Sequence, residues 1–385
     1  MKKLFALVGL VLLSTSLIAC RGERGKEFKV GLIASEATLQ DNGYNQFAVA
    51  GLNKIAAEYD NVSIKTVDFT TPANITTILN TLGEQEYDLV FTLEYNFETL
   101  ILNYAGGNPI AKRYPNTTYV VFNEFANTND AGERIHDNVI EILFSVNESS
   151  FLAGALSVLV NENRDLLLPT GYNFADDRAL AFVGGSNSNG IRVFGYGYVE
   201  GANHIAQELE VNYRYYENTT AGFGASAANA NMVKEFYNQG VNIVYGAAGG
   251  VASNIRNEAE TAKRLMVDVD ANQDALKPGH VLTSVLKKTD AVTYDITKEL
   301  LEGTLKDGAT TRYYDLKSLG TGITDLATIS GFLAQTDPAA AKWAEIKQKI
   351  QNLETAIIAG EIDVVDAQRG ETLDTAALTN ITFAN

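Results

Sequence analysis

At residues 41–52 the chain reads Asp41-Asn-Gly-Tyr-Asn-Gln-Phe-Ala-Val-Ala-Gly-Leu52, a few residues after the apolar run Lys29-Val-Gly-Leu-Ile-Ala-Ser35. The apolar run predicts a buried strand, the Asp-Asn-Gly triplet a turn, and the helical spacing of apolar residues from Tyr44 onward a helix. In open α/β sheets, ligands bind where such junctions aim helix N-termini and turn residues outward, so Tyr44 and Asn45 are candidate ligand contacts. The alternative is that Tyr44 only begins the core stripe and Asn42 caps the helix.

The same alternation continues along the chain and predicts an α/β fold. Apolar segments at 62–69, 87–94, 118–123 and 138–146 alternate with helical ones, and the alternation restarts after a turn-rich stretch at 161–177. Because 385 residues suffice for two domains, we expect two lobes, each a parallel sheet flanked by helices, with a hinged cleft between them. The expected limits are 28–165 with 285–308 for lobe 1, 170–284 with 309–365 for lobe 2, and 366–385 for a C-terminal tail.

The N-terminus has the order of a bacterial lipoprotein signal. Lys2 and Lys3 precede an apolar run at 4–13, and Leu17-Ile-Ala-Cys20 ends in the only cysteine of the chain. We expect residues 1–19 to be removed, Cys20 to carry lipid, and 20–27 to link the body to the extracytoplasmic face of the cell membrane. The alternative is a free buried cysteine after a short core helix.

Composition argues against several functions. The net charge of −17 gives no electrostatic reason to bind nucleic acid. The three histidines lack metal-ligand spacing, no Gly-x-Ser-x-Gly elbow occurs, and the glycine-rich stretch at 184–190 lacks the lysine of a phosphate-binding loop. We therefore expect no metal, no cofactor and no enzymatic activity.

Two acidic residues follow a second apolar strand, in the sequence Asp268-Val-Asp270. We expect at most one of them to point into the cleft. A carboxylate accepts two hydrogen bonds from adjacent hydroxyls, which is what a ribose diol offers. The alternatives are a helix cap and a calcium-binding type of surface acid.

Aromatic residues and a lysine complete the candidate site. Tyr44, with Tyr95 and Phe97 after the third strand, could sandwich a planar base. Lys287 lies where the chain is expected to recross the hinge, so it could reach a ligand from there; a solvated lysine is the alternative.

Short motifs in order along 28–365 resemble the basic membrane protein or purine nucleoside receptor lipoproteins, a family similar to type I periplasmic binding proteins. The motifs are Asp41–Gln46, Ser150–Gly154, Ala181–Gly185 followed by Arg192–Gly201, Ala248–Gly250, Val267–Asp270 and Thr283–Lys287.

The resemblance implies a monomeric binding protein that hands purine nucleosides to the permease and ATPase of an ABC importer. It implies these roles: Tyr44 stacks on the base, Asp41 and Asn45 bond its edge, Asp268 holds the ribose hydroxyls, Lys287 reaches the ribose, and Gly249 offers backbone contacts. Tyr44 replaces the usual Phe, and Asn123 stands where an acid commonly ends the strand. Other hypotheses are a binding protein for a sugar or other small polar ligand, a surface adhesin or signalling receptor, and a nucleoside-cleaving hydrolase.

Overall fold

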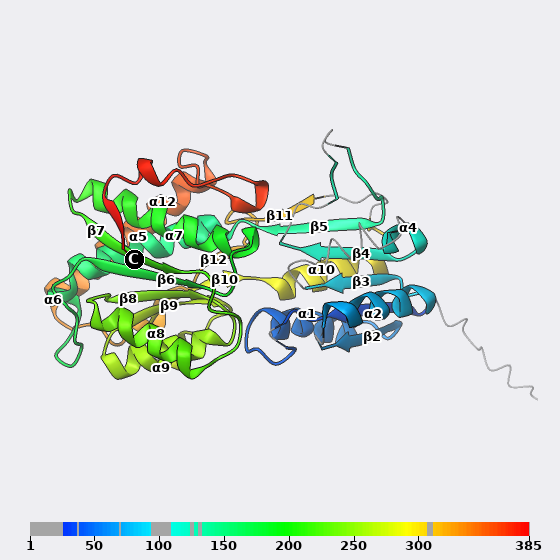
Figure 1. The fold of residues 1–385 in the computed structure, drawn as a ribbon, viewed down its shortest axis with the longest axis horizontal. Coiled ribbons are helices and arrows are strands. Elements are labelled where there is room, and N and C mark those ends of the chain that lie inside the picture. Colours follow the sequence, from blue (N-terminus) through cyan, green and yellow to red (C-terminus); the bar gives the residue numbers. More distant parts are fainter. Residues whose placement is uncertain are drawn as a thin grey trace, which may run out of the picture.

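The computed structural model describes residues 26–36, 38–68, 71–93, 109–123, 127–129, 133–305 and 311–384. Two sheets, each flanked by helices, form two lobes that lie side by side along the long axis of the molecule (Figure 1). This confirms the two-lobed α/β fold. Within the described ranges, no helix has the length and apolar character needed to span a bilayer.

Lobe 1 contains, in the described part of the chain, a six-stranded parallel sheet in the order β11-β5-β4-β3-β1-β2. Its strands are β1 (Phe28–Ile33), β2 (Val62–Val67), β3 (Leu89–Thr92), β4 (Thr118–Phe122), β5 (Val139–Phe144) and β11 (Thr311–Tyr314). Strands β3 and β5 are buried along their whole length, which explains their apolar runs.

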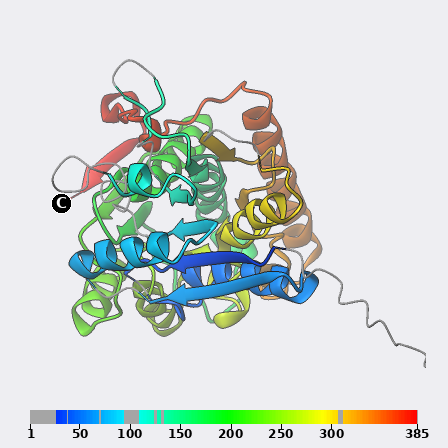
Figure 2. The same ribbon diagram turned by 90° about the vertical axis from the view of Figure 1, so that its right-hand side faces the viewer.

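Helices α1 (Tyr44–Glu58), α2 (Pro72–Glu84), α4 (Ile110–Arg113) and α10 (Thr289–Leu301) cover this sheet. Helix α10 is distant in sequence but packs closely on α1, and Figure 2 shows it in yellow beside the blue strands. The Thr293 hydroxyl donates to the carbonyl of Ala48 at 2.8 Å. A side chain at Gly51 would come within 2.2 Å of the carbonyl oxygen of Asp290, so only glycine allows this approach.

Lobe 2 contains, among the described residues, a seven-stranded sheet in the order β12-β10-β9-β8-β6-β7-β13, parallel except for the pair β10–β12. Its strands are β6 (Ala179–Gly184), β7 (Tyr213–Asn218), β8 (Ile243–Ala247), β9 (Leu265–Asp270), β10 (Val281–Lys287), β12 (Thr321–Ile323) and β13 (Ile381–Ala384). Its helices are α5 (Val146–Glu162), α6 (Arg164–Leu167), α7 (Asn189–Glu208), α8 (Ala227–Asn238), α9 (Val251–Ala262), α11 (Ala327–Ser330) and α12 (Asp337–Ile358), with 3₁₀ turns η1 (Asp274–Leu276), η2 (Ala367–Arg369) and η3 (Thr375–Ala377).

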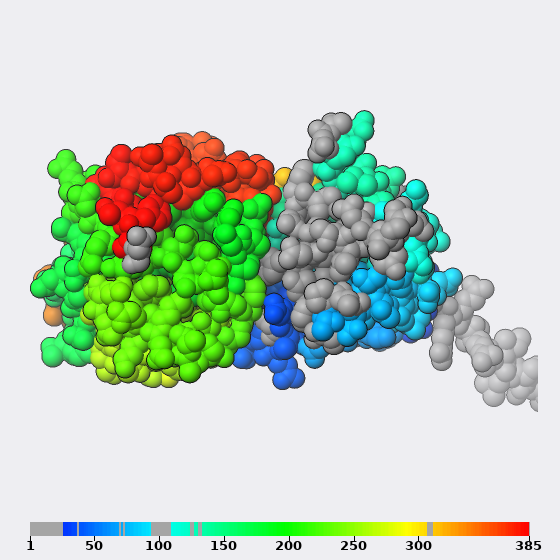
Figure 3. Space-filling model, in the orientation of Figure 1, coloured from blue at the N-terminus to red at the C-terminus, as the bar shows by residue number. Residues whose placement is uncertain are grey.

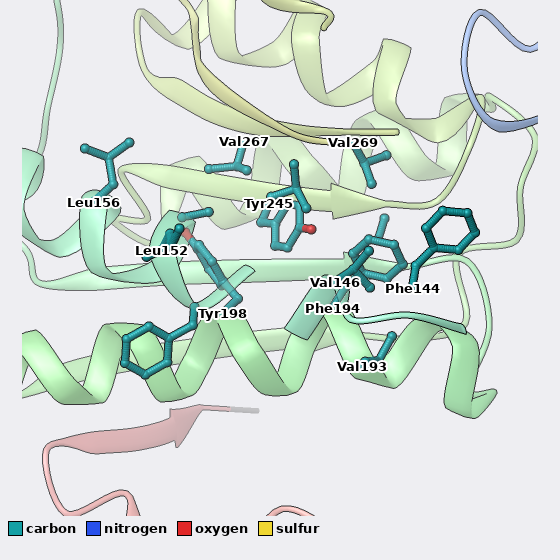
Figure 4. Packing of buried hydrophobic residues seen from close by; sticks show 14 of the residues in the cluster. Phe144, Val146, Leu152, Leu156, Val193, Phe194, Tyr198, Tyr245, Val267 and Val269 are labelled. Atoms are coloured by element: carbon teal, nitrogen blue, oxygen red, sulfur yellow. The ribbon is translucent and has the colours of Figure 1, made fainter. Parts of the chain in front are cut away.

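Helices α5 and α7 pack against each other and against the second sheet. Figure 4 shows Tyr198 of α7 beside Tyr245 of β8; their ring centroids are 5.0 Å apart. A Cβ at Gly154 would lie 2.0 Å from the carbonyl oxygen of Tyr198, and one at Gly201 would lie 1.9 Å from that of Phe151. Glycine therefore lets the two helix backbones touch.

Among the described residues the chain crosses between the lobes three times, at 144–146, 287–289 and 314–321. These crossings form the hinge.

The lobe limits differ from those expected from the sequence at three places. Helix α5 packs on α7 in lobe 2, whereas we expected it in lobe 1. Strand β11 pairs with β5 in lobe 1, whereas we expected it in lobe 2. The expected tail ends in β13, which pairs with β7, so residues 381–384 belong to the second sheet.

Candidate ligand-binding site

A small cavity lies where the two lobes meet; its empty space is about 340 Å³ when its opening to solvent is counted, but only about 20 Å³ is open to the centre of a water molecule. Lobe 1 lines it with Ser35, Asp41 and Tyr44, and lobe 2 with Ile191, Phe194, Phe223, Ala247, Gly249, Val269 and Asp270. Most of these residues follow a parallel strand or begin a helix, so the cavity is at the carboxyl edge of both sheets. The cavity therefore brings together three of the predicted ligand-binding residues: Asp41, Tyr44 and Gly249.

Asp41 lines the cavity and also caps helix α1. Its carboxylate accepts hydrogen bonds from the backbone N–H groups of Gly43, Asn45 and Gln46 at 2.9–3.1 Å. Burial raises the pKa of this carboxyl, and the three N–H groups oppose the rise. We expected Asn42 as the alternative cap; the N-cap residue is Gly43, and the Asp41 carboxylate supplies the side-chain acceptor for the first N–H groups of the helix.

Tyr44 is held rigidly by its hydroxyl. That group donates to the carbonyl of Leu93 at 3.1 Å and accepts from the Asn123 amide at 2.8 Å. The ring meets Phe122 edge to face, with centroids 6.3 Å apart. Because the hydroxyl bonds inside lobe 1, the ring is fixed at the cavity wall and need not be ordered when a ligand binds.

Asn123 lies behind Tyr44 rather than among the residues that line the cavity. It is 1% exposed, and its φ of 69° places it in the left-handed region at the end of β4. Its side-chain oxygen has no hydrogen-bond partner among the described residues. In this structure Asn123 therefore orients Tyr44.

Asn45 does not offer its amide to the cavity. Its oxygen accepts from the backbone N–H of Ser35 at 2.9 Å, and its nitrogen donates to the Ser35 hydroxyl at 2.9 Å and the Thr38 carbonyl at 2.8 Å. The side chain is fully buried. The expectation that it bonds the edge of a base is corrected: Asn45 fixes the loop after β1.

Of the two carboxylates on β9, Asp270 faces the cavity and Asp268 does not. Asp268 is 1% exposed and pairs with Arg256 of α9 at 2.5 Å, while its other oxygen accepts from the N–H of Val269 at 2.9 Å. Asp270 lines the cavity. The expectation that Asp268 holds ribose hydroxyls is corrected, because its oxygens are occupied behind the sheet; Asp270 is the carboxylate in position.

Lys287 ends β10 at the second crossing and is 1% exposed, so it is not a solvated lysine. Its Nζ lies 5.1 Å from the ring centroid of Tyr44, 5.2 Å from that of Phe194 and 5.3 Å from that of Phe144. Burial lowers the pKa of Lys287 and raises that of Asp270, and the charge of each partner opposes the other's shift. Lys287 is therefore a buried cation beside the faces of Tyr44 and Phe194, outside the residues that line the cavity but in electrostatic contact with the Asp270 carboxylate.

Contacts across the cleft show that the lobes are closed on each other. The backbone N–H of Tyr44, at the N-terminus of α1, approaches the Asp270 carboxylate and opposes the rise in its pKa. The amide nitrogen of Gln273 donates to the carbonyl of Asn42 at 2.5 Å. The helix dipole of α1 thus meets a carboxylate from the other lobe.

Sequence reasoning missed the aromatic residues that lobe 2 contributes. Phe223 follows β7 much as Tyr44 follows β1, so its position after a strand was the available signal. Phe194 was not among the predicted site residues, but it also lines the cavity. Tyr95, Phe97 and Cys20 lie outside the described residues.

The model of the PnrA-like ABC transporter substrate-binding proteins, the Bmp family, matches residues 28–368. The chain belongs to this family. Its members imply a small-molecule ligand and an ABC transporter as partners of the chain, in agreement with a cavity between two hinged lobes.

Relatives agree with this assignment. The nucleoside-binding protein BmpA of Lactococcus lactis is 26% identical over 94% of this chain and 99% of its own length, and basic membrane protein D of Borreliella burgdorferi is 26% identical over 80% and 82%. A solute-binding protein of an ABC transporter system from Aeropyrum pernix K1 has a similar fold, with a TM-score of 0.70, 21% identity, and coverage of 91% of this chain and 95% of its own.

Proposed function

We propose that this family member captures a purine nucleoside between its lobes and delivers it to an ABC importer. The observation that carries the proposal is that one cavity is lined by the ring of Tyr44 from lobe 1 and the carboxylate of Asp270 from lobe 2. A planar base gains about 0.5–1.5 kcal/mol from each well-placed aromatic neighbour beyond its buried area. A carboxylate suits the adjacent hydroxyls of ribose.

The aromatic residues of lobe 2 supply a second wall for the base. Phe194 and Phe223 line the same cavity as Tyr44, so a flat ring entering the cleft meets aromatic side chains from both lobes. This arrangement makes closure and base binding the same event, because the second wall arrives only when the lobes approach. The Lactococcus lactis relative, which aligns with almost the whole chain, is named a nucleoside-binding protein.

Lys287 and Asp270 would bind the pentose. The lysine donates and the carboxylate accepts, so together they match hydroxyls that can do both. Lys287 is buried and Asp270 is partly buried, so a ligand must replace contacts that they now make. A polar, uncharged sugar is favoured over a phosphate, which would approach the carboxylates of Asp41 and Asp270.

Titration calorimetry of the full chain in detergent tests the proposal. Inosine or adenosine should bind far more tightly than free ribose, galactose or uridine, because only the purines fill the space between the aromatic walls. Equal binding of ribose and inosine would mean that a sugar is the ligand and that the aromatic residues do not select a base. Chromatography of the recovered inosine should show no free base, and release of hypoxanthine would instead indicate a hydrolase.

The membrane anchor is part of the same proposal. We expect Cys20 to carry lipid and the protein to act as a monomer at the extracytoplasmic face of the cell membrane, beside its importer. In detergent phase separation, the expressed protein should enter the detergent phase and a Cys20→Ser variant should stay in the aqueous phase. Equal partitioning of the two would contradict the anchor.

A further inference from the structure

Residues 363–371, called here the C-terminal strap, lie between α12 and β13 at the level of the hinge. Both ends of the strap belong to lobe 2, since α12 packs on α5 and β13 pairs with β7. Figure 1 shows this part of the chain beside β11, at the boundary between the lobes, and Figure 3 shows the red C-terminal residues over lobe 2 reaching that boundary.

The first half of the strap is fixed to lobe 2. The Asn147 amide donates to the carbonyl of Val364 at 2.8 Å, and the backbone N–H of Val365 donates to the Glu200 carboxylate at 3.1 Å. Val364 and Ala367 are 5% and 1% exposed. The strap is therefore packed into the structure rather than lying loosely on its surface.

The second half of the strap reaches lobe 1. The side-chain amide of Gln368 donates to the carbonyl of Phe144 at 2.8 Å, and Phe144 is the last residue of β5 before the first crossing. The guanidinium carbon of Arg369 lies 4.5 Å from the ring centroid of Tyr313 in β11. Both contacts join a segment anchored in lobe 2 to the two lobe 1 strands that lead into the hinge.

The polar groups at this junction are incompletely satisfied. Gln368 is 4% exposed and Asn147 is 4% exposed, yet the side-chain oxygen of each has no hydrogen-bond partner among the described residues. A buried amide with an unpaired oxygen costs free energy, so packing alone would favour an apolar residue. The two amides hold the strap on either side of the first crossing: Gln368 binds Phe144 before it, and Asn147, in the first turn of α5, binds the strap after it.

We propose that the C-terminal strap stabilises the closed arrangement of the lobes from the hinge side. When lobe 1 rotates away, backbone angles change at the crossings, so Phe144 and Tyr313 move relative to a strap that stays with lobe 2. The bond to Phe144 and the stacking on Tyr313 exist in the closed arrangement and weaken on opening. Removing them shifts the population toward the open form, and the apparent affinity for a ligand that binds the closed form falls in proportion.

The test uses the full chain in detergent with two dyes attached through azido amino acids at Glu84 of lobe 1 and Glu235 of lobe 2, both exposed. Energy transfer between the dyes reports closure without any ligand, and inosine titration reports affinity. Arg369→Ala and Gln368→Ala should each lower energy transfer and weaken inosine binding about two- to tenfold, as expected for one cation–π contact or one hydrogen bond. The matched control is Thr379→Val, which removes a bond between Thr379 and Gln207 within lobe 2 and should change neither reading.

The affinity reading rests on the proposed function, whereas the energy-transfer reading does not. If inosine fails to bind the parent protein, the proposed ligand is wrong, and energy transfer alone decides the role of the strap. Arg369 is half exposed, so its replacement leaves the core intact even if the Gln368 variant does not fold. Unchanged energy transfer in a folded Arg369→Ala protein overturns the proposal.

Discussion

Tyr44 and Asp270 belong to different lobes, yet the backbone N–H of Tyr44 is close enough to the Asp270 carboxylate to oppose the rise in the pKa of Asp270. A Cβ on Gly43 would lie 3.3 Å from the same carboxylate oxygen, so the turn before α1 approaches Asp270 closely. Asp270 thus meets the opposite lobe at the cavity where a ligand would enter. Lobe closure and ligand binding use the same carboxylate.

Asp270 and Asp268 should respond differently to the same substitution. Asp270→Asn should weaken inosine binding by about 10- to 100-fold, the loss of one or two hydrogen bonds to a charged group. Asp268→Asn should leave affinity nearly unchanged but lower the free energy of unfolding by about 3 kcal/mol, because it leaves Arg256 without its buried partner. Calorimetry and urea unfolding of both variants measure the two effects. A larger affinity loss in the Asp268 variant would reverse the assignment.

Inosine affinity should decrease as the pH is lowered, and the pH at which the decrease begins should depend on Lys287. Burial raises the pKa of Asp270, and the charge of Lys287 opposes the rise. Protonated Asp270 accepts fewer hydrogen bonds, so affinity decreases as pH is lowered through that pKa. In Lys287→Gln the opposing charge is gone, the pKa of Asp270 is higher, and the decrease should begin at higher pH.

Dissociation constants measured from pH 5.5 to 8.5 for the parent and the Lys287→Gln protein give this comparison. Asp41 also has a raised pKa and faces the same cavity, but it is present in both proteins and cancels in the difference. Profiles that differ only by a constant factor would contradict coupling between Lys287 and Asp270.

The Tyr44→Phe variant distinguishes the contribution of the hydroxyl from that of the aromatic ring. The hydroxyl bridges the Leu93 carbonyl and the Asn123 amide inside lobe 1, so its loss should lower the free energy of unfolding by about 1–3 kcal/mol. The ring remains at the cavity wall, so inosine affinity should change by less than about threefold, whereas Tyr44→Ala should lose about tenfold or more. Tyr59→Phe removes an exposed bond to Glu302 and serves as the control.

Glu200 should make the protein less stable as pH rises. Burial raises the pKa of Glu200 to about 7, and the carboxylates of Asp363 and Glu371 add to the rise. The folded state therefore binds a proton more tightly than the unfolded state, and stability falls between the ordinary pKa of a glutamate and about pH 7. Glu200→Gln still accepts from Val365 but should show a smaller fall in unfolding free energy between pH 4.5 and 8. Parallel pH curves for the two proteins would rule this out.

The sequence predicted the fold class because alternating strands and helices are local patterns. It also predicted the junction at Tyr44 and the return of the chain at Lys287 for the same reason. It did not distinguish Asp268 from Asp270, because the pleat ends between them. Asp270 has a φ of 70°, outside the strand region, so the rule that alternate residues share a face no longer applies to it.

The sequence also did not predict correctly which lobe some elements belong to. The spacing of apolar residues in α5 does not say which sheet the helix covers. Contact between Gly154 and the backbone of Tyr198 decides the matter, and it depends on residues far apart in the chain. Strand β13 was not predicted either, because residues 381–384 form a strand only by pairing with β7.

Because α5 and α7 pack so closely, replacing a glycine between them by alanine should lower the free energy of unfolding strongly. A Cβ at Gly197 would lie 2.1 Å from the carbonyl oxygen of Asn147, and one at Gly201 would lie 1.9 Å from that of Phe151. The atoms in the way are backbone, so the helices must separate; Gly201→Ala should lower the free energy of unfolding by about 3 kcal/mol, at the upper end for overpacking. Gly224→Ala is the matched control: a Cβ there meets nothing within 4 Å, and it should change stability by less than about 0.5 kcal/mol. Equal urea midpoints for the two variants would mean that α5 and α7 are not held together by backbone contact.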